Sequence, residues 1–130
     1  MEHYIIGNYK KVKMIKEVKD KIVIASDFSD TLGARYRKDG PHSAEEVLEN
    51  HLEPKFIKAM SGNEKLLIDL DGVWGYPSSF VSGTFGILSM KYSAETVLDV
   101  LEFKSEDNSI RLEKIIFEIK RIGNLYWCLH

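Results

Sequence analysis

Apolar and polar positions follow two different spacings along this chain, one typical of strands and one typical of helices. KIVIAS (21–26) is a β-branched run of strand length, and EKLLIDLDG (64–72) is a short apolar run that turn-forming residues close. VLDVLEF (97–103) predicts a third strand, although its first residues also fit a helical turn that begins at Ser93. The chain therefore contains several candidate strands of five to seven residues, as is usual for buried strands.

A long segment with helical spacing, HSAEEVLENHLEPKFIKAMSGN (42–63), lies between the first two predicted strands. Ser43 and Glu46 have the spacing of a capping box, which predicts the start of a helix. Apolar residues then recur on one face until Gly62. Because proline lacks an N–H group, we expect Pro54 to break or restart this helix.

Two further helices are predicted later in the chain. SSFVSGTFGILSMKY (78–92) predicts a helix that begins at one of its two leading serines, and Gly83 and Gly86 would let it lie close to a sheet. NSIRLEKIIFEIKRIGN (108–124) has an apolar stripe with charges opposite, which is the clearest amphipathic pattern in the chain. We expect Gly123 to end that helix.

The order of these elements predicts an α/β fold with helices packed on a parallel or mixed sheet. Before residue 21, HYIIGNY (3–9) predicts a short edge strand, and KKVKMIKEVKD (10–20) fits either a strand or a helical turn. Right-handed crossovers would bring SDFSDTLGARYRKDG (26–40), DGVWGYPSS (71–79) and KSEDNS (104–109) to one edge of the sheet. Ligands and partners of open α/β sheets bind at that edge.

Length and composition agree with one globular domain over 1–130, with its core at about 20–122. Apolar residues make up 44% of the chain, and the formal net charge of −2 gives no reason to expect nucleic acid or an anionic membrane as a partner. The longest uncharged run, 72–90, contains a proline and several glycines, so it does not predict a membrane-spanning helix. The start of the chain shows no secretory signal, and the cytoplasm is the expected location.

The side chains that usually bind metals or attack substrates are not grouped in the sequence. Cys128 is the single cysteine, and the four histidines have no metal-ligand spacing. The glycine-rich stretch 72–89 contains neither a P-loop nor a dinucleotide-binding fingerprint, and Ser78 does not lie in a hydrolase nucleophile elbow. We therefore expect no metal, no cofactor and no catalytic residues.

Ser78 and Ser79 are predicted at the start of the second helix, where unpaired backbone N–H groups are exposed. A serine in that place caps the helix in many proteins. The functional alternative is a phosphate acceptor, because the positive end of the helix dipole and the same N–H groups would stabilise a phosphate. The sequence leaves both interpretations open.

Two pairs of charged residues are predicted at the same edge. Asp69 and Asp71 share one face of a strand, where they could bind a metal with a nucleotide, act as a base, or only end the strand and accept backbone hydrogen bonds. Arg35 and Arg37 alternate with Tyr36, so in an extended segment they would share a face and could grip a carboxylate or phosphate. Solvation at the surface is the alternative for the arginine pair.

LLIDLDGVWGYPSSFVSGTFGIL (66–88) resembles the central strand, loop and helix of STAS domains, the fold of sulfate transporters and anti-sigma-factor antagonists. The segments GARYRKDG with Ser43, DLDGVWGYPSSF and FG are similar to those of a STAS-like family of unknown function. The resemblance extends over about 20–122. It implies a single STAS-like domain with a mixed, mostly parallel sheet of about four to five strands.

The resemblance also implies a function. In anti-sigma-factor antagonists a serine at this junction is phosphorylated by a histidine-kinase-like ATPase, and the unmodified form binds that partner. Ser78 and Ser79 occupy the matching positions. Pro77 stands where the antagonists have Asp, and Phe80 stands where they have Gly, which suggests a fixed, partly apolar docking surface as the alternative.

The leading hypothesis is a non-catalytic regulatory module that binds an ATPase or serine kinase, or another regulatory protein, through Asp69 to Thr84, with serine phosphorylation as a switch. Its expected contacts with a partner or an anion are listed together: Arg35, Arg37, Asp69, Asp71, Tyr76 and Phe80. The alternative hypothesis is a domain that binds a small anion or a nucleotide at the same edge.

Overall fold

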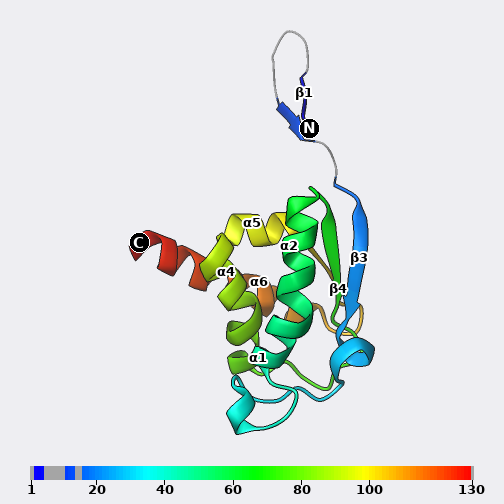
Figure 1. Cartoon of the computed structure of the whole chain (residues 1–130), viewed down its shortest axis with the longest axis vertical. Coiled ribbons are helices and arrows are strands. Elements are labelled where there is room, and N and C mark those ends of the chain that lie inside the picture. The colour runs from blue at the N-terminus through cyan, green and yellow to red at the C-terminus, as the bar shows by residue number, and fades with distance from the viewer. Residues whose placement is uncertain (1, 5–10, 14–15, 130) are drawn as a thin grey trace.

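The computed structural model describes residues 2–4, 11–13 and 16–129. It contains a parallel sheet of β3 (Val18–Val23), β4 (Lys65–Asp69) and β5 (Leu101–Lys104), with β4 in the centre. The predicted α/β fold is confirmed, and the α-helices lie to one side of the sheet (Figure 1). A sheet of four to five strands is not confirmed, because the described sheet has three strands.

A separate antiparallel pair is formed by β1 (Glu2–Tyr4) and β2 (Lys11–Lys13). The edge strand expected over 3–9 therefore includes part of β1, while residues 5–9 lie outside the described residues. Of the two structures that fitted 10–20, the strand is found at 11–13 and again from Val18.

Buried and partly exposed residues alternate along β4, and the buried ones mark the face of the sheet that the helices cover. Leu66 and Ile68 of β4 are fully buried, and Ile68 lies level with Ile22 of β3 and Phe103 of β5. The helices α2 (Glu53–Ser61) and α5 (Ala94–Val100) pack against the sheet. Because successive strand residues point to opposite faces, Leu66 and Ile68 face these helices and Leu67 points to the other side of the sheet. Among the described residues, no helix combines the length and the apolarity needed to cross a membrane.

The first long helix runs without interruption through α1 (Ala44–Val47), a π-helical turn (Leu48–Leu52) and α2. Its predicted cap is confirmed, since Ser43 Oγ accepts a hydrogen bond from the backbone N–H of Glu46 at 3.1 Å. Of the two outcomes expected at Pro54, a break is not found, whereas a restart agrees with the start of α2 at Glu53, one residue before the proline. Proline stands in the first turn of α2, directly after the widened π-helical turn, where the ring fits and the missing N–H does not stop the helix.

The second long helix begins at Ser78, as α3 (Ser78–Val81), and continues through a π-helical turn (Ser82–Gly86) and α4 (Ile87–Tyr92). Its glycines approach other helices rather than the sheet, which corrects the prediction. A Cβ at Gly83 would lie 2.8 Å from Ala44 Cβ, and a Cβ at Gly86 would lie 2.6 Å from Ile122 Cδ1. The glycines therefore permit close helix–helix packing.

Two predicted strands have other bounds than expected: β3 lies three residues earlier in the chain, and β5 is shorter. The last residues of KIVIAS belong to a π-helical turn (Ile24–Phe28). The Asp27 carboxylate accepts a hydrogen bond from the N–H of Val23 at 2.7 Å and stabilises this turn at the end of the strand. In VLDVLEF the helical alternative is confirmed: Ser93 caps α5, which extends to Val100, and only 101–104 form β5.

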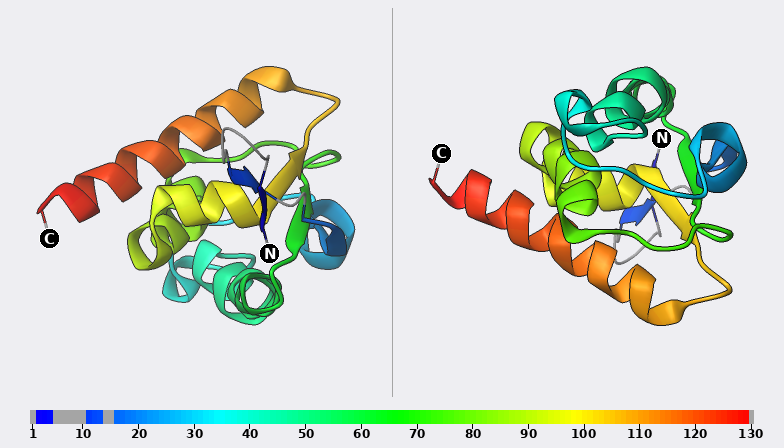
Figure 2. Two further views of the ribbon diagram at one scale, coloured as in Figure 1. Left: turned by 90° about the horizontal axis from the view of Figure 1, so that it is seen from above. Right: turned by 90° about the horizontal axis from the view of Figure 1, so that it is seen from below.

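The last helix, α6 (Ser109–Leu129), continues past Gly123, so the expected stop is wrong. Gly123 is buried where α6 crosses α4 and α5, and a Cβ there would overlap Ser89 Oγ and lie 2.9 Å from Ala94 Cβ. The glycine is needed for close packing rather than for a helix end. Figure 2 shows α6 along the outside of the molecule, with its C-terminal end extending beyond the other helices.

Candidate functional site

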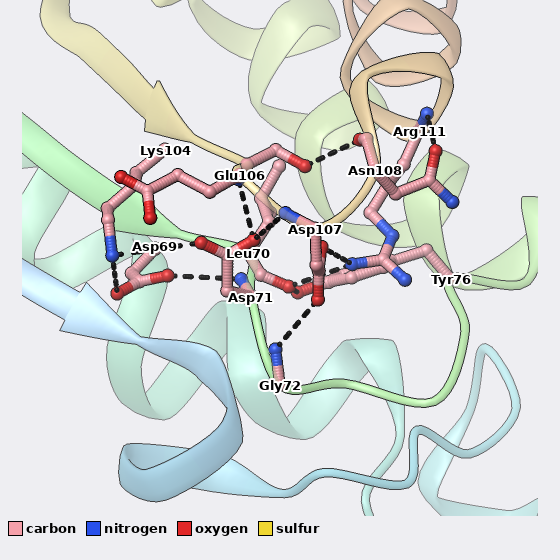
Figure 3. Close-up of polar contacts among 11 residues, drawn as sticks. Asp69, Leu70, Asp71, Gly72, Tyr76, Lys104, Glu106, Asp107, Asn108 and Arg111 are labelled. Carbon is pink, nitrogen blue, oxygen red and sulfur yellow. Dashed lines mark hydrogen bonds and ion pairs between the residues drawn. The ribbon is translucent and has the colours of Figure 1, made fainter.

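The loop after β4 and the connection between β5 and α6 meet at the carboxyl edge of the sheet (Figure 3). Asp71 joins them, because its Oδ1 accepts hydrogen bonds from the backbone N–H groups of Glu106 at 2.8 Å and Asp107 at 3.0 Å. The N–H of Asp107 is the main cause that lowers the pKa of the Asp71 carboxyl group, since these donors favour its charged form. A second hydrogen bond joins the same two segments, because Asp107 Oδ2 accepts from the N–H of Gly72 at 3.2 Å.

Arg111, in the first turn of α6, holds the same loop from the other side. Its guanidinium donates to the carbonyl oxygens of Leu70 and Val73, each at 3.2 Å, and it pairs with Asp107 at 3.0 Å. The guanidinium carbon also lies 4.9 Å from the centre of the Tyr76 ring, a cation–π distance. We call Asp71, Tyr76, Asp107 and Arg111 the loop clamp.

Tyr76 is the aromatic member of the loop clamp. Its hydroxyl donates to the Leu70 carbonyl oxygen at 2.9 Å, and burial raises the pKa of Tyr76. This tyrosine is therefore a fixed hydrogen-bond donor at neutral pH. Its polar contacts lie within the chain, and its predicted contact with a partner stays a prediction.

Asp69 is also engaged within the chain. Its Oδ1 accepts from the N–H of Asp71 at 3.0 Å, and its Oδ2 lies 3.4 Å from Lys104 Nζ. The charge of Asp69 is the main cause that raises the pKa of Lys104. Within the described residues, no group of three or more His, Cys, Asp or Glu side chains is arranged to hold a metal ion. The contacts favour the simpler role given to both aspartates by the sequence, which is to close the strand and organise the loop.

Sequence reasoning missed Arg111 and Asp107, although a local signal was present. They are four residues apart at the start of an amphipathic helix, the spacing at which opposite charges pair. Asn108 Oδ1 accepts from the N–H of Arg111 at 3.1 Å and so organises the same turn. The carbonyl groups that Arg111 reaches lie about forty residues away in sequence, and no local pattern could indicate them.

Ser78 and Ser79 are exposed at the start of α3, but neither side chain caps it. Pro77 is the capping residue, and its carbonyl oxygen accepts from the N–H groups of Phe80 and Val81, each at 3.0 Å. The interpretation of these serines as caps is therefore wrong, because the proline begins the helix one residue earlier. Both hydroxyl groups remain accessible to solvent.

The two arginines of GARYRKDG point to different places. Arg35 Nη2 donates to Ser82 Oγ, in the π-helical turn that follows α3, while Arg37 pairs with Glu49 on the helix that α1 begins. The expected shared face is wrong, because residues 37–39 form a 3₁₀ turn and the alternation of an extended segment is lost. Arg35 therefore reaches the serine segment, and Arg37 is held by carboxylates.

The aromatic residues of the loop are placed differently from the prediction. Phe80 is only 1% exposed and packs on Ala44 and Val47, so its predicted contact with a partner is corrected: it is a core residue. Trp74, which sequence reasoning did not select, is 85% exposed. It lines a groove of about 470 Å³ that also includes Ser78 from the loop and Phe117 from α6.

Comparison with known proteins gives one match. The model of a family described as a STAS-like domain of unknown function (DUF4325) matches residues 43–111, which contain α1 to β5, the loop clamp and both serines. No curated protein and no solved structure matches the chain.

Proposed function

Since the chain belongs to this STAS-like family, we propose that it is a non-catalytic regulatory module that binds an ATPase or kinase partner through the segment Asp69 to Thr84. The observation that carries the proposal is the exposure of Trp74, at 85%, beside two exposed serines on a loop that the loop clamp holds in place. A large exposed aromatic residue on a fixed loop is typical of an anchor for a protein partner.

The proposed switch is phosphorylation of Ser79. Ser82 is three residues further along the same helix face, and Arg35 already donates to its hydroxyl. A phosphate on Ser79 would lie near this guanidinium and at the positive end of the helix dipole. It would add nearly two negative charges to the docking segment without unfolding the helix.

The alternative of a small-anion or nucleotide site has less support. Arg37 is paired with Glu49, and the groove of about 260 Å³ beside Arg35 is also lined by Glu45 and Glu49. Carboxylates at that position would repel an anion. The non-catalytic assignment is supported by the contacts of Asp69, Asp71 and Tyr76, which use these groups to hold the loop.

The test is to incubate the chain with a histidine-kinase-like ATPase from the same genome and with ATP, and to measure intact mass and binding. We expect a gain of one phosphate that Ser79→Ala abolishes and Ser78→Ala retains. We also expect Trp74→Ala to weaken binding of the unmodified chain at least tenfold. Ile57→Ala, which truncates an exposed apolar residue on α2, is the matched control and should bind normally.

The two parts of the proposal can fail separately. An unchanged mass with an ATPase that is active on another substrate would refute the phosphorylation switch. Unaltered affinity of the Trp74→Ala variant would refute the docking surface.

A further inference from the structure

The groove of about 470 Å³ is lined on one side by the loop after β4 and on the other by the first half of α6. Two of its apolar residues, Val81 and Ile115, are buried. Two others are large aromatic side chains, Trp74 on the loop and Phe117 on α6, which are 85% and 63% exposed. The groove therefore offers apolar surface that the described chain does not cover.

Both sides of the groove are held in place by the rest of the fold. On the loop side, Arg111 donates to the carbonyl oxygen of Val73, and the N–H of Trp74 donates to that of Asp30 at 2.9 Å. On the helix side, Ile115 and Ile119 of α6 are buried in the core. A groove that exists before binding loses little conformational entropy when it is occupied, which favours recognition of a short segment.

Three charged side chains line the groove, and two of them have partners within the chain. Arg111 pairs with Asp107 at 3.0 Å, and Glu118 accepts from Arg121 Nε at 3.1 Å. Lys114 is exposed and forms no hydrogen bond or ion pair among the described residues. Glu118 has the four-residue spacing at which it could pair with Lys114, but its carboxylate is bound to Arg121. The groove therefore has one positive charge that the chain does not neutralise.

We infer that the groove binds a short acidic segment of the protein partner, with an apolar side chain against Trp74 and Phe117 and a carboxylate on Lys114. The inference rests on the proposed function, because it takes the occupant to be part of a protein. It adds the chemistry of the bound segment. It also makes α6 a second side of a docking surface that was proposed for Asp69 to Thr84 alone.

Other classes of occupant fit the groove less well. Small-molecule sites bury about 70–90% of their ligand, whereas both aromatic side chains that line this groove are mostly exposed. A nucleic acid requires that several phosphates be neutralised together, and Lys114 is a single unpaired cation. A protein segment continues beyond the groove at both ends, so it can cover both rings while supplying only one carboxylate.

The test is an NMR titration of the full, isotope-labelled chain with the synthetic peptide Ser-Asp-Glu-Leu-Phe-Glu-Asp-Ser, without any ATPase. We expect the indole N–H signal of Trp74, which Trp74→Phe identifies, to shift as the peptide is added up to about 2 mM. A peptide with Lys in place of every Asp and Glu should bind at least fivefold more weakly. The same loss is expected when Ser replaces Leu and Phe in the peptide.

Variants of the chain test the two contacts separately. Lys114→Glu and Phe117→Ala should each weaken binding of the acidic peptide at least fivefold. Lys120→Glu reverses an exposed lysine of α6 that does not line the groove, and Ile57→Ala truncates an exposed apolar residue of α2; both should bind normally. Circular dichroism of each variant checks that it is folded.

The outcomes separate this inference from the proposed function. An unshifted Trp74 signal, equal binding of the basic peptide or unaltered binding by Lys114→Glu overturns the inference, whether or not an ATPase binds through Trp74. Equal binding of phenylacetate would make the groove a small-molecule site, and a signal that shifts with the concentration of the chain alone would give it to a second copy; either result overturns the inference. Peptide binding that Lys114→Glu weakens, in a chain that binds no ATPase, supports the inference and refutes only the proposed partner.

Discussion

Replacing Gly123 by alanine tests the packing of α6 against the rest of the helices. Gly123 lies inside α6, and an added Cβ would overlap Ser89 Oγ and lie 2.9 Å from the Cβ and 3.0 Å from the backbone nitrogen of Ala94. The backbone of Ala94 cannot yield as a flexible side chain would. Forcing a methyl group into such a site destabilises a protein by about 1–3 kcal/mol.

The hydroxyl of Ser89 adds a second contribution. It is buried and donates to the carbonyl oxygen of Ile119 at 2.6 Å, so displacing it leaves a buried polar group that costs about 1–3 kcal/mol. The better helix propensity of alanine offsets about 1 kcal/mol. We therefore expect Gly123→Ala to lower the free energy of unfolding by about 3 kcal/mol, the middle of these ranges.

Urea denaturation followed by circular dichroism at 222 nm measures this change. Gly75→Ala is the matched control, because no atom lies within 4 Å of an added Cβ there, and it should change stability by less than about 1 kcal/mol. In a Ser89→Ala background, Gly123→Ala should be less harmful by about 1 kcal/mol, because the overlapping oxygen is gone. A Gly123→Ala variant as stable as the parent would refute the close packing and support the helix end that the sequence predicts.

Two further predictions concern the loop clamp and the core. The pKa of Asp71 is lowered in the folded chain, so the carboxylate contributes to stability above the unfolded pKa of about 4, and this contribution is lost as the pH falls through the folded value. The difference in urea midpoint between the parent and Asp71→Asn should be clear at pH 6 and shrink toward zero below about pH 3.5. A difference that does not depend on pH would contradict the role of the charge. Phe80→Ala should destabilise the fold by about 3–5 kcal/mol and Phe117→Ala by less than about 0.5 kcal/mol, because the Phe80 ring is buried and the Phe117 ring is exposed. Thermal unfolding measures both effects, and equal effects would contradict these placements.

Patterns that depend on near neighbours in sequence predicted the structure well. The strand within 64–72, the capping of the first long helix by Ser43 and the helix that starts at Ser78 are all confirmed. Each depends on local backbone geometry and on which side chains face the core. The STAS-like resemblance is likewise confirmed, by the family that matches 43–111.

The helix boundaries predicted at proline and glycine were less reliable, because each of these residues occurs in more than one structural setting. Pro54 was expected to break or restart a helix, and the helix continues as α2 after a π-helical turn that makes room for the ring. Gly123 was expected to end a helix, but close contact with Ala94 and Ser89 is what requires it. A single sequence does not show which helix will cross at a given residue, so these uses could not be told apart.

The candidate site was predicted in position rather than in detail. Strand order and right-handed crossovers predicted that Asp71 and the two serines follow the carboxyl end of the central strand, which is where they lie. The exposure of Trp74, 85%, was missed because a tryptophan within an uncharged run suggests a buried residue. Arg111 was missed because its acceptors are backbone carbonyl groups, which every residue carries and which leave no pattern in sequence.

The hydrogen bonds from Arg111 to the carbonyl groups of Leu70 and Val73 make the structure sensitive to the length of the connection 105–108. Ile115 and Ile119 are buried and hold α6 in one orientation about its axis, so α6 does not turn to follow a change in that connection. A residue added or removed there would move the N–H groups of Glu106 and Asp107 away from Asp71, and with them the pairing of Asp107 with Arg111. Residues of this connection can be exchanged more easily than their number can be changed, because one insertion would release the loop from the start of α6.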